Sequence, residues 1–151
     1  MAEQDLVIER LIDAPVARVF KAWTEAKQVK EWWGPQGFTA PVCEIDARPG
    51  GRLRIVMRGP DGNDYPMSGT YRDVEPNKRL VFVSVAEDGA GDALLEAFTE
   101  VTFEAQGNKT KLIMKTSAVG LAPVAADMLR GMEQGWSETL DRMVAFAAKG
   151  A

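Results

Sequence analysis

Carboxylates are the side chains of this 151-residue chain with the clearest capacity for acid-base chemistry. Four of them lie in a region of short alternating segments: Glu44, Asp46, Glu100 and Glu104. Two carboxylates in a dry pocket can acquire separate pKa values and act as general acid and base. Glu100 and Glu104 adjoin Val101 and Phe103, however, and alternation places them on the opposite face from those apolar side chains. Because charged residues are rarely buried without a partner, a solvated position is predicted for these carboxylates.

Histidine is absent from the chain, and cysteine occurs once, as Cys43. These counts exclude an intramolecular disulfide, Ser-His-Asp and Cys-His nucleophilic catalysis, and zinc sites built from His or Cys clusters. Cys43 has no basic neighbour in sequence that would lower its pKa, so a buried thiol is predicted rather than a nucleophile. No catalytic residue, metal or organic cofactor is therefore assigned from the sequence.

Two further polar sets could recognise a ligand. A basic stripe could bind an anionic ligand or partner: Arg52, Arg54 and Arg58. These arginines alternate with apolar residues, so they are predicted to lie on the outer, solvated face of a strand. Hydroxyl groups could orient a ligand inside an apolar pocket: Tyr65, Ser68, Thr70, Tyr71 and Ser84. Which hydroxyls point inward depends on strand register, and a slip of one residue would reverse the choice.

The composition is that of one ordinary soluble domain spanning residues 1–151, with 46% hydrophobic and 26% charged residues. A net charge of -4 and a pI near 5.0 provide no positive field for nucleic acid or anionic lipid headgroups. No segment approaches the ~18 apolar residues of a membrane span, and the acidic N-terminal residues are unlike a secretory signal. We therefore expect a cytoplasmic protein without nucleic-acid partners or a membrane span.

Hydrophobic periodicity predicts the elements that must position these side chains. Alternation indicates a strand over about residues 4–12, and helical spacing then indicates two short helices, capped by Asp13 and Thr24 and ended by Gly34 and Pro35. Residues 41–117 form alternating runs divided by turn residues, typical of an antiparallel meander of about six strands. From about residue 123 to 149, apolar residues recur every three or four positions, predicting one long amphipathic helix that covers the sheet. The order indicates an α+β fold.

Local motifs along nearly the whole chain add to this order. They stand at residues 10–15 (RLIDAP), 19–24 (VFKAWT), 32–35 (WWGP), 44–51 (EIDARPGG), 61–62 (DG), 69–71 (GTY), 75–80 (EPNKRL), 110–112 (TKL) and 135–136 (GW). Together with the element order, they resemble the Aha1-like branch (activator of Hsp90 ATPase homologue 1-like) of the START/Bet v 1-like superfamily, also called SRPBCC. The resemblance implies a helix-grip fold, in which a curved antiparallel sheet of about seven strands wraps a long C-terminal helix and encloses a cavity for apolar or amphipathic molecules.

Members of this superfamily serve as ligand carriers, ligand sensors, and cyclases or aromatases, so the fold alone does not assign a role. The family name also refers to a co-chaperone that activates the Hsp90 ATPase, in which the similar domain follows an N-terminal module. Interaction with Hsp90 is not expected here, because all 151 residues are accounted for by the helix-grip pattern. A homodimer is a further candidate arrangement, since two-fold dimers are the commonest oligomers.

Apolar side chains form the candidate cavity lining that the resemblance supports: Trp32, Trp33, Phe38, Met57, Tyr71, Phe82, Met114, Met128, Met132 and Trp136. Methionine adapts to irregular shapes, and aromatic rings offer a large contact area, which suits a pocket for apolar ligands. The alternative for each residue is that it fills a solid core. The expected function is binding of a hydrophobic or amphipathic small molecule. A cyclase or dehydratase acting on an aromatic or polyketide-like substrate and a chaperone-linked or stress-related interaction module remain alternatives.

Overall fold

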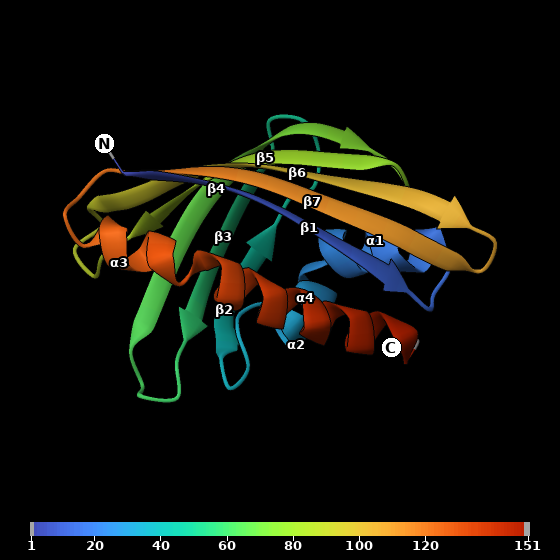
Figure 1. Cartoon of the computed structure of the whole chain (residues 1–151), viewed down its shortest axis with the longest axis horizontal. Coiled ribbons are helices and arrows are strands. Elements are labelled where there is room, and N and C mark those ends of the chain that lie inside the picture. Colours follow the sequence, from blue (N-terminus) through green and yellow to red (C-terminus); the bar gives the residue numbers. More distant parts are fainter. Residues whose placement is uncertain (1, 150–151) are drawn as a thin grey trace.

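A computed structural model describes residues 2–149, which form a curved antiparallel sheet of seven strands in the order β1-β7-β6-β5-β4-β3-β2. Figure 1 shows α4 crossing the concave side of this sheet, with α1 toward one end and α3 at the other. The strands are β1 (Glu3–Ile12), β2 (Thr39–Ile45), β3 (Arg52–Arg58), β4 (Asp64–Glu75), β5 (Arg79–Glu87), β6 (Ala93–Gln106) and β7 (Lys109–Gly120). The helices are α1 (Val16–Thr24), α2 (Ala26–Trp32), α3 (Ala125–Arg130) and α4 (Met132–Ala148). The predicted α+β helix-grip architecture is confirmed.

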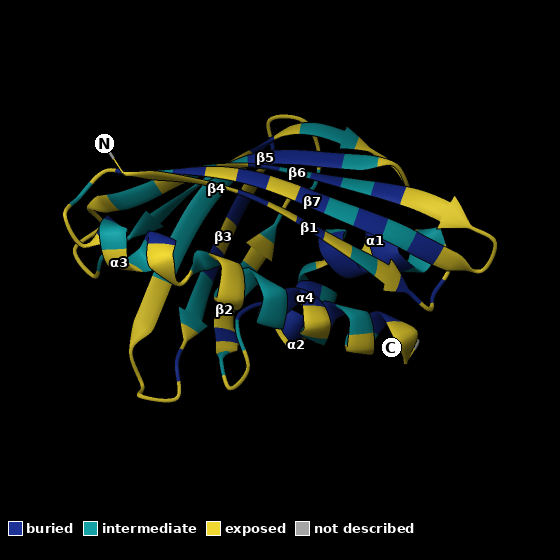
Figure 2. Ribbon diagram, viewed as in Figure 1, coloured by how far each residue is buried: buried dark blue, intermediate teal, exposed yellow. Residues whose placement is uncertain are grey.

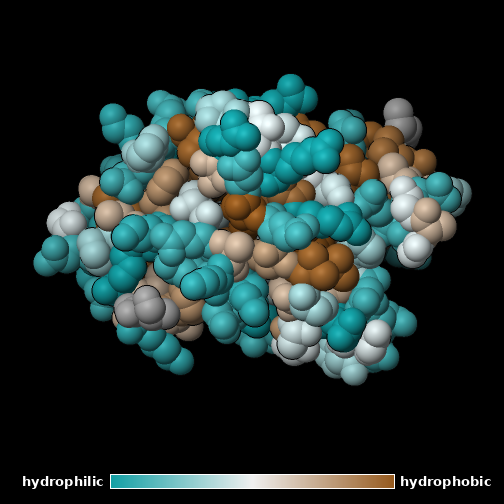
Figure 3. All heavy atoms as spheres, turned by 180° about the vertical axis from the view of Figure 1, so that it is seen from behind, coloured by the Kyte–Doolittle hydropathy of each residue, from teal (hydrophilic) through white to brown (hydrophobic). Residues whose placement is uncertain are grey.

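Alternation along the strands separates a core-facing surface from a solvated one. In β1, Leu6, Ile8 and Ile12 are buried, whereas Val7 is 63% and Leu11 is 56% exposed. The same alternation is visible along β1 and β7 in Figure 2. Seen from behind, the molecule carries hydrophobic residues in small separate groups among hydrophilic ones (Figure 3). The concave face of the sheet therefore supplies the interior against which the helices pack.

The two short helices lie where the periodicity predicts them, but their N-cap residues are not the expected ones. Pro15 is the N-cap of α1 and Glu25 is the N-cap of α2, and neither makes a side-chain capping hydrogen bond. Thr24 instead donates its hydroxyl hydrogen bond to the carbonyl of Phe20, at 2.9 Å. Asp13 and Thr24 are therefore not the caps: Asp13 lies before the N-cap of α1, and Thr24 closes the last turn of that helix.

The predicted continuous helix over residues 123–149 is wrong in one respect, because the structure divides it at Gly131. Glycine is a poor helix former, and a break there costs less than at other residues. The break allows α3 and α4 to pack in different places: Ala125 and Leu129 of α3 are buried, and α3 contacts the end of β7 beside Gly120. The amphipathic pattern therefore predicts the helical region correctly, but two helices, α3 and α4, divide it.

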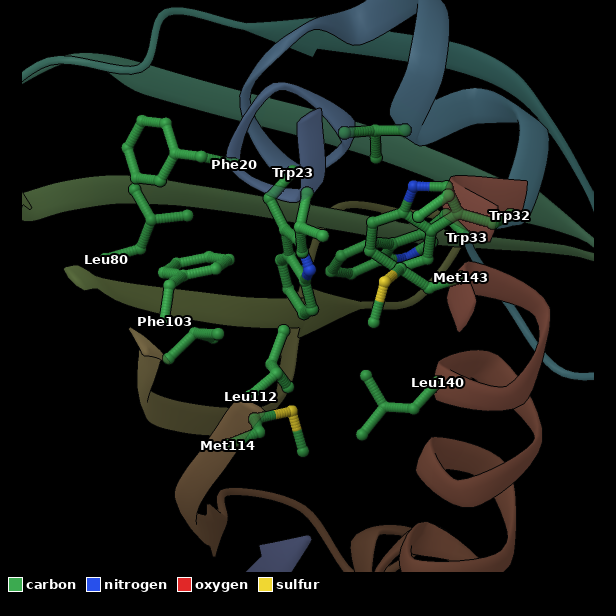
Figure 4. Packing of buried hydrophobic residues seen from close by; sticks show 14 of the residues in the cluster. Phe20, Trp23, Trp32, Trp33, Leu80, Phe103, Leu112, Met114, Leu140 and Met143 are labelled. Atoms are coloured by element: carbon green, nitrogen blue, oxygen red, sulfur yellow. The ribbon is translucent and has the colours of Figure 1, made fainter. Parts of the chain in front are cut away.

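Large apolar side chains of the core meet where α1, α2 and α4 face the sheet (Figure 4). Trp32 is fully buried, and its indole N–H donates to the carbonyl of Ala22 at 2.9 Å. The four tryptophans form a continuous series of ring contacts, with centroid separations of 4.8 Å (Trp23–Trp32), 5.5 Å (Trp32–Trp33) and 5.4 Å (Trp33–Trp136). Leu140 and Met143 of α4 are fully buried against this end of the fold.

Candidate ligand-binding pocket

A pocket of about 250 Å³ lies between the sheet, α3, the N-terminal half of α4 and the loop after α2. Residues from each of these elements line it: Trp33, Gly34, Pro35, Met57, Tyr65, Pro66, Met67, Phe82, Ser84, Ala86, Leu95, Ala97, Thr99, Met128, Met132, Gly135, Trp136 and Thr139. The pocket therefore joins chain segments that are far apart in sequence, and the sheet register and helix packing must both form before it exists.

Small side chains on β5 and β6 create the space on the sheet side. The register places Ser84 opposite Ala97, and both line the pocket. Further along the same strands, Leu80 of β5 and its partner Val101 of β6 are fully buried in the core. The inward-facing positions thus change from large to small residues along one pair of strands. Since a small side chain cannot reach the helix, this change leaves the pocket unfilled at one end of the sheet.

The helix side is built from flexible and aromatic side chains. Met128 comes from α3, and Met132 and Trp136 come from α4. Trp136 meets Trp33 edge to face, with ring centroids 5.4 Å apart and an interplanar angle of 81°. At Gly135 a Cβ atom would lie 3.7 Å from the ring of Pro35, so the helix passes close to the loop there.

Gly34 fixes the shape of that loop. Its φ of 104° lies in the left-handed region that favours glycine. A Cβ atom at this position would stand 2.9 Å from Cβ of Phe38 and 3.2 Å from Sδ of Met57. A larger residue would therefore both strain the backbone and displace the neighbouring pocket wall.

No charged residue is among the described residues that line the pocket. Thr99 shares a hydrogen bond of 2.9 Å with Thr116, and the hydroxyl of Thr139 donates to the carbonyl of Gly135 at 2.7 Å. The hydroxyls of Tyr65 and Ser84 have no such internal partner among residues 2–149. The pocket thus offers an apolar surface with two polar groups that a ligand could engage.

Six residues of the predicted lining do meet in this pocket: Trp33, Met57, Phe82, Met128, Met132 and Trp136. The other four lie elsewhere. Trp32 and Met114 are fully buried in the core. Tyr71 contacts Phe82, with ring centroids 6.0 Å apart, and Phe38 contacts Tyr65, with ring centroids 5.9 Å apart. Tyr71 and Phe38 therefore pack against residues of the wall without lining the pocket themselves.

The structure places the other candidate polar residues outside the pocket. Glu100 pairs with Arg79 at 2.7 Å, and Asp46 pairs with Arg48 at 2.8 Å. Arg54 lies on the outer face, where it contacts Ser68 and Glu87. The remaining members of these sets line a groove formed by β2 to β5 or lie at exposed positions: Glu44, Glu104, Arg52, Arg58 and Thr70. The predicted outward orientation of the arginine stripe is confirmed.

Cys43 is half-buried in β2, and burial raises the pKa of its thiol from 9.0 to about 11. The neutral thiol is therefore the dominant form near neutral pH, and a neutral thiol is a poor nucleophile. Burial likewise raises the pKa of Tyr71, which keeps its hydroxyl protonated. Neither residue lines the pocket.

Several lining residues were absent from the predicted set: Gly34, Pro35, Pro66, Met67, Ala86, Leu95, Ala97, Thr99, Gly135 and Thr139. The small ones carried a signal in the sequence. Ser84 and Ala86 share one face of a strand whose preceding inward residue is Phe82, and Ala97 and Thr99 precede Val101 in the same way. A run of small residues on an inward face indicates missing volume, whereas a search for large apolar residues selects core positions as readily as pocket walls.

A curved antiparallel sheet closed by a C-terminal helix, with an apolar pocket between them, defines a protein of the helix-grip class. The profile of the Activator of Hsp90 ATPase homolog 1-like protein family matches residues 13–148, and the chain belongs to this family. None of the helices in residues 2–149 is long and apolar enough to cross a membrane.

Solved structures share the fold over almost the full chain. An uncharacterized protein from Rhizobium leguminosarum is 30% identical, with a TM-score of 0.76 over 98% of this chain and 96% of that one. The AHSA1 protein from Silicibacter pomeroyi is 24% identical, with a TM-score of 0.82 over 98% and 100% of the two chains. A protein from Arthrobacter aurescens is 24% identical, with a TM-score of 0.83 over 96% and 86%. No match was found among curated proteins.

Proposed function

We propose that this protein binds a small, neutral, apolar or amphipathic molecule between the sheet and α4, as a carrier or a sensor. The observation that supports this proposal most directly is the chemistry of the pocket wall. Its side chains are uncharged, and the hydroxyls of Tyr65 and Ser84 are available for hydrogen bonds. Burying an ionised group without a partner is costly, so this wall favours a neutral ligand over a carboxylate or an amine.

The volume narrows the ligand class further. A cavity of about 150 Å³ accepts benzene, and drug-sized ligands occupy about 300–1,000 Å³. At about 250 Å³, this pocket suits a molecule of one or two rings rather than a long acyl chain. Trp33, Trp136 and the methionines favour an aromatic ligand, because aromatic and thioether groups interact favourably with ring edges and faces.

The test measures binding of 1-naphthol, a neutral two-ring molecule with one hydroxyl. Binding is detected by quenching of tryptophan fluorescence and by native mass spectrometry. Ala97→Phe would fill the pocket, because Ala97 faces it from β6. Ser117→Phe is the matched control, since Ser117 is exposed on β7. We expect Ala97→Phe to weaken binding at least about tenfold and Ser117→Phe to leave it unchanged. Equal affinity in the Ala97→Phe variant would overturn the proposal.

The enzymatic alternative, a cyclase or dehydratase, requires a proton donor or acceptor beside the substrate. No carboxylate is among the described residues of this wall, and Tyr65 is the ionisable side chain that lines it. The uncharged wall therefore favours ligand binding over acid-base catalysis as the proposed function.

A further inference from the structure

Arg142 joins α4 to the loop that forms one wall of the pocket. Its Nη1 donates to the carbonyls of Trp33 at 3.4 Å, Gly34 at 2.8 Å and Pro35 at 3.1 Å. Its Nη2 donates to the carbonyl of Glu31 at 3.2 Å. One side chain of α4 therefore contacts the carbonyls of three consecutive residues of the wall.

The carbonyl of Glu31 lies in the last turn of α2, where a helix leaves its final acceptors without internal donors, and those of Trp33, Gly34 and Pro35 directly follow the helix. A cation at this end also interacts favourably with the helix dipole. Burial lowers the pKa of Arg142, a sign that the guanidinium has left part of its water shell to make these contacts. Hydrogen bonds to four separate carbonyls hold the guanidinium in a fixed position beside the loop.

A second contact from α4 holds the same loop. Oε1 of Glu138 accepts a hydrogen bond from the main-chain N–H of Gln36 at 3.1 Å. Its other oxygen accepts from Gln134 at 3.1 Å, which orients the carboxylate along the helix. The helix thus binds carbonyls through Arg142 and an amide through Glu138.

The same helix supplies the wall that faces this loop. Met132 and Trp136 line the pocket from α4, and Trp33 and Pro35 line it from the loop. Trp33 and Trp136 meet edge to face, so helix and loop together close the pocket on this side, and the contacts of Arg142 and Glu138 hold the loop against the helix.

We propose that Arg142, assisted by Glu138, is a positioning residue that keeps the pocket closed on this side and thereby limits the size of the ligand. The proposal rests on the proposed binding function. Without the guanidinium, the loop carbonyls are released to water and Trp33 is free to move away from Trp136. The pocket then becomes wider and less defined, so small ligands lose contacts while larger ones gain access.

The test compares Arg142→Met with Arg10→Met. Arg10 also anchors α4, through Asp141 at 3.1 Å and Ser137 at 2.9 Å, but it does so from β1 and does not touch the loop. Both variants lose an arginine that holds the helix, and methionine keeps much of the side-chain length. Only Arg142→Met removes contacts to the pocket wall.

The measured quantity is the ratio of affinities for 1-naphthol and for 1-hydroxypyrene, a neutral four-ring analogue. We expect Arg142→Met to shift this ratio by about tenfold toward the larger ligand, and Arg10→Met to leave it unchanged. If loss of an arginine that holds α4 only destabilised the fold, the affinity ratio would shift equally in both variants. An unchanged ratio in Arg142→Met, or an equal shift in both variants, would therefore overturn the proposal.

A second measurement needs no ligand. In ¹⁵N NMR spectra, we expect Arg142→Met to shift and broaden the indole N–H signals of Trp33 and Trp136, while that of Trp23, whose ring contacts are with Trp32 and Phe103, stays in place. Arg10→Met should leave all of these signals unchanged. If the wild-type protein binds neither compound, the proposed function is wrong. The indole signals still show whether Arg142 holds the loop that carries Trp33. Should Arg142→Met fail to fold, Arg142→Gln serves instead, because its shorter, neutral side chain has two N–H donors and cannot hold four carbonyls.

Discussion

Ser84 is the residue whose role the pocket geometry defines most sharply. Ser84 lines the pocket from β5, opposite Ala97, and its hydroxyl has no hydrogen-bond partner among residues 2–149. We expect Ser84→Ala to weaken binding of 1-naphthol by about 1 kcal/mol, the usual net worth of one hydrogen bond, and to leave naphthalene binding unchanged. Isothermal titration of both compounds measures the difference. A similar loss for the two compounds would show that Ser84 shapes the pocket without bonding to the ligand.

Cys43 gives a prediction that depends on pH. Raising its thiol pKa from 9.0 to about 11 lowers the thiolate fraction at pH 8 by about 100-fold. We expect iodoacetamide to alkylate the folded protein correspondingly slowly at pH 8, and the rate to rise as the pH approaches 11. Unfolding in urea should restore the rate of an ordinary thiol. Because the folded state favours the protonated thiol, its contribution to stability is present below pH 9 and is lost as the pH rises through 11.

Residue types alone could not complete the site. Met114 and Met132 are equivalent in sequence terms, since both recur within an apolar pattern, yet one is fully buried core and the other lines the pocket. The difference is set by the size of the residues that face them across the fold. That information comes from pairing between distant strands, which a single strand does not contain.

At the scale of elements, the break between α3 and α4 can be tested directly. Gly131 has φ of -89° and ψ of -3°, and a Cβ atom there would lie no closer than 3.9 Å to other atoms. We expect Gly131→Ala to stabilise the protein by about 0.4 to 1 kcal/mol, because alanine reduces the entropy of the unfolded chain. Urea denaturation measures this change.

Gly120 provides the contrasting case at the other contact of α3. A Cβ atom at this position would stand 2.9 Å from Cβ of Ala125, so Gly120→Ala should destabilise the protein by pushing α3 from the sheet. If Gly131→Ala destabilises as well, the backbone at the break is less helical than its dihedral angles indicate.

The extent of sequence prediction differs between strands and helices. Alternation identified the first strand and the six-stranded meander, because a sheet with one wet face must alternate polar and apolar residues. The C-terminal periodicity identified the helical region but not its division, since Gly131 falls between positions of the apolar stripe. The expected caps were wrong because α1 and α2 each begin without a side-chain capping hydrogen bond, at Pro15 and Glu25, so a capping residue type nearby did not mark the helix start.

In the molecule as a whole, one end of the sheet is filled and the other end is hollow. Leu140 is fully buried in the filled end, whereas Met132 is half-buried beside the pocket. We expect Leu140→Ala to lower the free energy of unfolding by about 2 to 5 kcal/mol and Met132→Ala by about 1 kcal/mol. Met132→Ala should nevertheless weaken 1-naphthol binding more than Leu140→Ala does, when each loss of affinity is divided by the loss of unfolding free energy. Comparing denaturation and titration for both variants tests this separation of folding from binding.

The contact series from Trp23 through Trp32 and Trp33 to Trp136 has a photophysical consequence. Neighbouring indole rings with centroids 4.8, 5.5 and 5.4 Å apart exchange excitation energy rapidly, so light absorbed by any of them can migrate along the series. A quenching ligand beside Trp136 would then extinguish emission from the deeply buried rings as well. A quenching ligand in the proposed pocket would therefore reduce the emission of all four tryptophans rather than that of Trp136 alone.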